Sequence, residues 1–378
     1  MPFGQGIAQW VMDGFPMSFE TLRKLYGGGI DDTGYPIWLA VIYLLTGTWG
    51  DFGETLIPMI IKCVISTYCA ILIYRTAQRH YGEVVARIAC VFVVFNPNMI
   101  YWCGTMFKEP ELVFLCCLFV NEMDKALGRN AKMTLKALLP ASLIGLTFFL
   151  FRAALGLVAF VSVLAQVVMA SNRIMSTGKK VIAGVLVAIV LAIGYGDSLL
   201  IQVHDTIDTI RSDDQQVNME WRSRRKDASG RSNQFIKYAG AAAFAPLIFT
   251  LPFPTFNTAN NVQILQMMLS GGSYIKNILS FFVIFAMFVM LFSGEWRRHV
   301  FLIAYTCGYL CALVFSEFAQ SGRFHMPIMP MLMMFAAYGI SLVHQHPKWR
   351  SFYVIVLVIE VIACLGWNWF KLKGRGMI

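Results

Sequence analysis

Charged side chains are scarce in this 378-residue sequence. Asp, Glu, Lys and Arg make up only 14% of it, whereas 57% of the residues are hydrophobic and the mean hydropathy is +0.62. Soluble domains carry about 25% charged residues. The shortage of charge therefore excludes a water-soluble enzyme, a disordered tail, a coiled coil and a disulfide-stapled secreted module, and it predicts an integral membrane protein.

The motifs of familiar soluble enzymes are also lacking. The sequence has no Walker A loop, no G-x-S-x-G, no H-E-x-x-H and no dinucleotide-binding fingerprint. Its nine cysteines fall in apolar stretches without metal-ligand spacing, so we expect small buried hydrophobic side chains. No n-region, h-region and cleavage site open the chain, so we expect no removable signal peptide.

Long apolar runs fill most of the chain. Because a helix needs about 20 mostly apolar residues to cross a bilayer, they predict an all-α polytopic membrane protein with about ten transmembrane helices. The predicted spans are 54–74, 84–103, 109–127, 135–151, 153–170, 181–201, 274–293, 299–316, 326–343 and 351–370. The chain then divides into an N-terminal membrane module (1–201), an external region (202–273) and C-terminal transmembrane helices (274–378).

Two regions do not fit the pattern of a transmembrane span. The stretch Tyr35–Gly47 is too short to cross, and Pro36 suits the first turn of a helix, so we expect a helix at the outer interface. Residues 202–238 are polar, and the prolines that follow forbid a long regular helix. We therefore expect an external loop followed by a Pro-rich re-entrant segment.

The net charge of +10 reflects topology better than nucleic-acid binding, because Lys and Arg concentrate in cytoplasmic connections. One set of alternate connections holds most of the basic residues, namely Arg75, Arg79, Arg87, Lys125, Arg129, Lys132, Lys136, Arg173, Lys179, Lys180, Arg297, Arg298, Lys348 and Arg350. The other set holds only Lys108, Arg152 and Arg323. This asymmetry places the second set on the external face.

The external side collects the residues that are candidates for chemistry. Asp31 and Asp32 follow a run of three glycines, and a carboxylate beside an apolar surface can act as a general base or a metal ligand. The alternative is an ordinary turn or helix cap. Lys108 and Glu109 occupy a short turn, which is either a solvated turn or part of a site. Arg152 lies in an apolar run, where a charge is costly unless it snorkels or pairs with an anion.

The segment 316–330 is the densest polar stretch between two spans. Arg323 can fork onto a phosphate or a carboxylate, and His325 can add a hydrogen bond. A surface turn with an ion pair from Glu317 to Arg323 is the alternative. Ion-coupled transport has little support, because Lys62 and Glu122 lie nearer the predicted helix ends and mid-span depth is almost free of charge.

These residues occur in an order that resembles the GT-C superfamily of polytopic glycosyltransferases, which use polyprenyl-phosphate-linked sugars. The matching features are an acidic outer loop, an apolar helix that starts at Tyr35-Pro36, a Phe95-Asn96-Pro97 segment, a short outer turn with Glu109, and a late Arg-plus-Pro helix start at 322–330. Each motif is short, but together they cover well over half of the chain.

The resemblance implies a role for each candidate. Asp31 or Asp32 would be the catalytic base, or would bind a divalent metal as in some branches of the family; no other cofactor is implied. The remaining roles are donor-phosphate binding by Arg323, Arg152 and Lys108, and substrate binding by Glu109, His325 and Tyr35. The expected partners are a polyprenyl-phosphate-sugar lipid, a glycan, lipid or protein acceptor, and membrane lipids, at the periplasmic face of a bacterial inner membrane.

Two other functions stay open. An O-antigen or capsule polymerase or ligase also uses external arginines, and the cluster Arg222, Arg224, Arg225 and Arg231 partly fits it. A flippase or a structural subunit of an envelope assembly would need no external carboxylate pair. Activity that depends on Asp31 or Asp32 would distinguish an enzyme from these last two.

Overall fold

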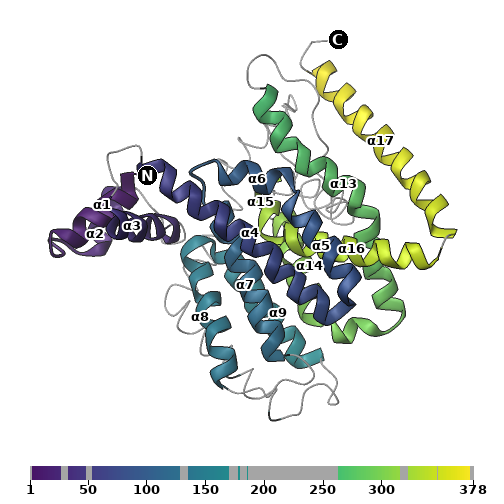
Figure 1. Ribbon diagram of the computed structural model, residues 1–378, viewed down its shortest axis with the longest axis horizontal. Helices are drawn as coiled ribbons and strands as arrows, with labels where there is room; N and C mark the ends of the chain where they lie inside the picture. The colour runs from purple at the N-terminus through teal and green to yellow at the C-terminus, as the bar shows by residue number, and fades with distance from the viewer. Residues whose placement is uncertain are drawn as a thin grey trace, which may run out of the picture.

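The computed structural model describes residues 2–26, 33–47, 53–127, 135–169, 178, 185, 263–315, 322–346 and 348–374. Every regular element in these ranges is helical (Figure 1). The first half contains α1 (Pro2–Met12), α2 (Phe19–Leu25), α3 (Gly34–Thr46), α4 (Gly53–Tyr81), α5 (Glu83–Val94), α6 (Pro97–Cys103), α7 (Glu109–Leu127), α8 (Leu135–Phe151) and α9 (Ala153–Met169). The second half contains α13 (Gln263–Phe292), η4 (Glu295–Arg298), α14 (Val300–Phe315), α15 (Gly322–His325), η6 (Met326–Ile328), α16 (Met329–Gln345) and α17 (Lys348–Gly374).

Four described helical stretches are long and apolar enough to cross a membrane: Glu54–Tyr81, Gly272–Phe292, Gly322–Gln345 and Lys348–Trp369. The pair α5 and α6 makes a fifth if it counts as one span. Helices α8, α9 and α14 are apolar but shorter. The fold is therefore that of a helical membrane protein, whereas the count of ten spans is not confirmed, and the predicted span 181–201 lies outside the described helices apart from Val185.

The predicted span 84–103 is broken rather than straight. Helices α5 and α6 meet at an angle of 47°. The cause is local: the side chain of Asn96 accepts hydrogen bonds from the backbone of Asn98 and Met99, and Pro97 occupies the first turn of α6. A proline there cannot continue the preceding helix, and an Asn cap starts a new one.

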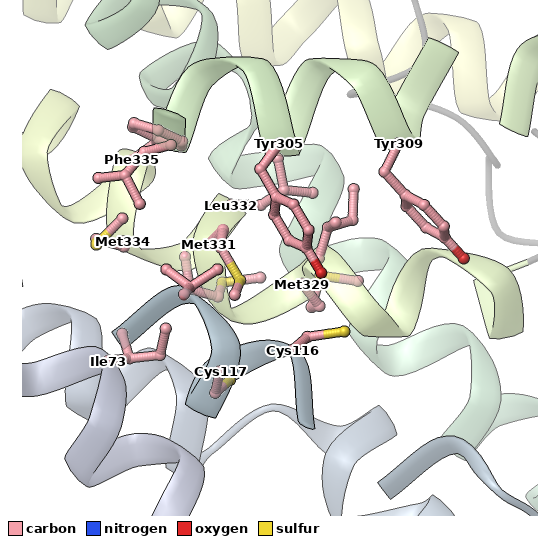
Figure 2. Close-up of a cluster of buried hydrophobic side chains, with 14 of the residues drawn as sticks. Ile73, Cys116, Cys117, Tyr305, Tyr309, Met329, Met331, Leu332, Met334 and Phe335 are labelled. Carbon is pink, nitrogen blue, oxygen red and sulfur yellow. The ribbon is translucent and has the colours of Figure 1, made fainter. Parts of the chain in front are cut away.

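The bundle is centred on α16, whose first nine residues are all buried. Figure 2 shows Tyr305 pointing from α14 toward Met329 and Cys116, with Tyr309 farther along the same helix and Met331, Met334 and Phe335 of α16 on the other side of Tyr305. In Figure 1, α1 to α3 project from the bundle beside the start of α4, and α17 lies along the far edge with mostly exposed apolar side chains. An exposed apolar helix at the edge suits contact with lipid.

The cysteines are all free thiols, as expected without a disulfide framework. Their predicted burial is only partly right. Cys69, Cys103, Cys116 and Cys117 are buried, whereas Cys63 and Cys311 are exposed. Both exposed thiols lie on helices whose outer faces carry apolar side chains, so an apolar stretch does not by itself place a residue in the core.

Candidate functional site

The site begins where α6 gives way to α7. Glu109 is the first residue of α7, a position where a carboxylate gains from the helix dipole. Its side chain is fully buried, and Arg323 of α15 donates from Nε to its Oε1 atom. The Arg323 guanidinium also lies 4.5 Å from the ring centre of Phe107 and 5.9 Å from that of Trp102. The alternative prediction, an ion pair with Glu317, falls on a residue outside the described ranges.

Arg323 has donor groups to spare. Its side chain is 34% exposed, and among the described residues its only hydrogen bond is the one to Glu109. Both Nη groups therefore remain available for an anion, while Nε stays fixed by the carboxylate. A planar guanidinium held in this way suits an oxygen-rich ligand such as phosphate.

Arg152 lies at the elbow between α8 and α9. Its Nη1 atom donates to the hydroxyl of Tyr309 at 2.7 Å, and this hydroxyl donates in turn to the carbonyl of Phe324 at 3.1 Å. Its guanidinium carbon lies 4.5 Å from the centre of the Phe324 ring. No carboxylate pairs with Arg152 in the described part of the chain. The structure thus joins Arg152 to the residue that follows Arg323.

Lys108 connects the turn before α7 to the same elbow. Its Nζ atom donates to the carbonyl of Phe151 at 2.8 Å. The start of α3 reaches this point as well, because a Cβ atom at Gly34 would lie only 2.6 Å from Cε2 of the Phe151 ring. A glycine is therefore required where α3 packs against the end of α8.

Lys62 is the main residue that sequence reasoning missed. It is fully buried in α4, where its Nζ atom contacts the hydroxyl of Tyr35 at 3.0 Å and a carboxylate oxygen of Glu111 at 3.6 Å. The sequence placed it near a span end, but packing encloses it. The signal was a lysine inside an apolar run, which is costly without a partner. We call Lys62, Lys108, Arg152, Arg323, Glu109 and Glu111 the charged cluster.

Tyr35 contacts Lys62 of the charged cluster, and its predicted substrate contact stays a prediction. Burial, with a smaller effect from the charge of Glu111, raises the pKa of the Tyr35 hydroxyl far above its ordinary value. The hydroxyl is therefore neutral at any physiological pH, and it can both accept from Lys62 and donate to another group.

His325 belongs to α15, as does Arg323. It is fully buried, and its Nδ1 atom lies 3.1 Å from Nζ of Lys276 in α13. Its predicted contact with substrate therefore stays a prediction. Lys276 was not predicted as a site residue, because no acidic residue lies three or four positions from it on the helix.

The two predicted catalytic carboxylates, Asp31 and Asp32, lie outside the described residues. The next residue, Thr33, is buried at the start of α3, two positions before Tyr35. Within the described ranges, no group of three or more His, Cys, Asp or Glu side chains could hold a metal ion. The question of a divalent metal therefore depends on the pair that the structure does not describe.

A second polar group lies at the other end of the bundle. Asp124 of α7 accepts from Nε of Arg79 at 2.7 Å and lies 2.6 Å from Nε2 of His80. The His80 ring is also 4.9 Å from that of His299, which precedes α14. Arg79 is one of the arginines predicted to be cytoplasmic, and the assignment of this end to the cytoplasmic face stays a prediction.

Comparison with known proteins gives no further guide. No protein-family model matches the chain, and no curated protein is significantly similar to it.

Proposed function

We propose that the chain is a membrane glycosyltransferase that moves a sugar from a polyprenyl-phosphate donor to a lipid, polysaccharide or protein acceptor on the outer face of a bacterial inner membrane. One observation carries the proposal. Arg152 and Arg323 are half-buried, are joined through Phe324, and keep N–H groups for which no described residue is an acceptor. A buried cation without a full set of acceptors favours an anionic ligand.

A lipid-linked phosphate suits this setting better than a soluble nucleotide. The chain has no nucleotide-binding motif, and the helices around the charged cluster expose apolar side chains such as Leu56 and Ile60 of α4. A polyprenyl tail can lie against such surfaces while its phosphate reaches the two guanidinium groups.

The proposed reaction is a displacement at the anomeric carbon of the donor sugar. The acceptor hydroxyl oxygen attacks the anomeric carbon, the bond from that carbon to the phosphate oxygen breaks, and the phosphate leaves with the electron pair. Asp31 or Asp32 takes the hydroxyl proton. The negative charge on the phosphate grows during this step, so Arg152 and Arg323 stabilise the transition state more than the bound donor.

Glu109 has two roles in this proposal. Its Oε1 atom fixes the guanidinium of Arg323, while its buried Oε2 atom has no hydrogen-bond partner among the described residues. A buried carboxylate oxygen without a partner is costly. A hydroxyl of the sugar or of the acceptor would satisfy it, which agrees with the substrate-binding role that the resemblance implies for Glu109.

The first test measures the phosphate site. Arg152→Gln and Arg323→Gln should each raise the KM for a polyprenyl-phosphate sugar by about tenfold or more, since a charge-assisted hydrogen bond contributes about 1.5–3 kcal/mol. Arg297→Gln is the control, because Arg297 lies in the exposed element η4. Unchanged KM values in both cluster variants would remove the proposed phosphate site.

The second test concerns catalysis. Asp31→Asn and Asp32→Asn are made singly and together, and sugar transfer is assayed in membranes. We expect at least one single variant to lose most activity; full activity in the double variant refutes the assignment. Polymerised glycan from a diphosphate-linked donor would favour the polymerase or ligase instead. Lipid movement without any bond change would favour the flippase.

A further inference from the structure

Lys62 of the charged cluster hydrogen-bonds to two other segments of the chain. Its Nζ atom donates to the carbonyls of Thr105 at 2.8 Å and Phe107 at 2.6 Å, in addition to its contact with the Tyr35 hydroxyl at 3.0 Å. The side chain is fully buried. Tyr35 lies in α3, and Thr105 and Phe107 lie in the turn before α7, so Lys62 of α4 contacts two segments that are distant from it in sequence.

The three acceptors define the state of the lysine. Two carbonyl oxygens accept only, and an ammonium group has three N–H donors, which matches the three contacts. Glu111, 3.6 Å away, provides the opposite charge. The two carbonyls and the hydroxyl thus use the hydrogen-bonding capacity of the Lys62 amine within the protein.

A buried ion pair is an expensive way to fill space, because well-packed apolar residues of the same volume are often as stable or more stable. The segments that Lys62 joins suggest what it contributes. Tyr35 lies three positions after Asp32, and Thr105 and Phe107 directly precede Lys108 and Glu109. One ammonium therefore fixes the start of α3 relative to the turn before α7.

We propose that Lys62 is a positioning residue that holds the start of α3, through Tyr35, in register with the Lys108–Glu109 turn. The inference deepens the proposed glycosyl transfer and rests on it. Lys62 touches neither donor nor acceptor; it acts through the two segments. Its loss should therefore lower kcat. Because Glu109 of that turn fixes Arg323, donor binding should also weaken, though less than on loss of either arginine.

The test uses a charge-free double variant, Lys62→Met with Glu111→Leu, which leaves no buried charge unpaired. As a folding control, the double variant in detergent must first unfold at a temperature close to that of the wild-type protein. We expect kcat to fall about 100-fold, as a displacement of about 1 Å at a reacting centre can cause, with the donor KM rising less than the about tenfold expected for Arg323→Gln.

A second measurement does not depend on activity. Amide hydrogen exchange is followed in peptides that cover 33–40 and 103–108, where freed backbone should exchange about tenfold faster in the double variant. Tyr35→Phe removes only one arm, so it should speed exchange in 33–40 alone. Unchanged exchange in both peptides of the double variant overturns the inference, as does faster exchange with an unchanged kcat.

These outcomes separate the two ideas. If wild-type protein transfers no sugar from any polyprenyl-phosphate donor, the proposed function fails, and the exchange data still decide whether Lys62 fixes both segments. If wild type is active and the double variant shows an unchanged kcat, the proposed function stands and the positioning role is refuted.

Discussion

Gly339 allows the backbones of α13 and α16 to pack closely together. It lies on α16, where a Cβ atom would come within 2.7 Å of the carbonyl carbon and 2.9 Å of the Cα atom of Phe282 on α13. These are backbone atoms, so no rotamer change can relieve the contact. Small residues allow membrane helices to approach in this way. Gly339→Ala therefore forces two central spans apart by about 1 Å, close to the overpacking that costs up to about 3 kcal/mol.

The net effect is smaller, because alanine is a better helix former than glycine by about 1 kcal/mol. We expect Gly339→Ala to destabilise the protein by about 2 kcal/mol. Gly366→Ala on α17 is the matched control: nothing lies within 4 Å of its Cβ position, so the same substitution should stabilise by up to about 1 kcal/mol. Both are measured by reversible unfolding in detergent. A Gly339→Ala variant as stable as wild type would refute the packing of α13 against α16.

The remaining predictions concern the opposite end of the bundle. Asp124→Asn should cost about 2–3 kcal/mol, because Arg79 and His80 lose their buried partner, although the partial exposure of Arg79 reduces the loss. Glu83→Gln, in a pair whose side chains are 41% and 74% exposed, should change the stability far less. His299 lies outside the four long spans, and burial, together with the charge of His80, lowers its pKa from 6.5 to about 3. The unfolded chain takes up a proton first, so stability should fall as the pH drops from about 6.5 toward 3. His299→Gln should flatten that slope in thermal unfolding measured at several pH values; an unchanged slope would assign it to other groups.

Helix positions were predictable wherever charges or prolines bound an apolar run. The predicted range 109–127 matches α7, and 135–151 matches α8. Gly47, expected at the end of the interfacial segment, caps α3 with a positive φ of 64°. The interfacial position itself stays a prediction. The sequence missed the break between α5 and α6, although Asn96-Pro97 carried the signal, because hydropathy alone does not register a cap followed by proline.

The sequence identified candidate residues for the site, but it did not predict which of them contact one another. Arg323 and Glu109 were both singled out, yet they are 214 positions apart, and nothing local pairs them. Arg152 and Tyr309 are 157 positions apart. Lys62 shows the limit most clearly. Lys62 was predicted to lie nearer a helix end, whereas its burial depends on distant segments that tertiary packing brings to it.

Two arginines of this chain show why unmatched donors point to a ligand. Arg79 and Arg323 are almost equally exposed, at 33% and 34%, and each pairs with one carboxylate through Nε. The guanidinium of Arg79 is nevertheless saturated: Nη1 donates to Asn121 and Nη2 to Thr76 and Asn121. Neither Nη of Arg323 has an acceptor among the described residues. An arginine that serves the fold is given its acceptors by the fold, and the Nη groups of Arg323 are the ones that the proposed function assigns to the donor phosphate.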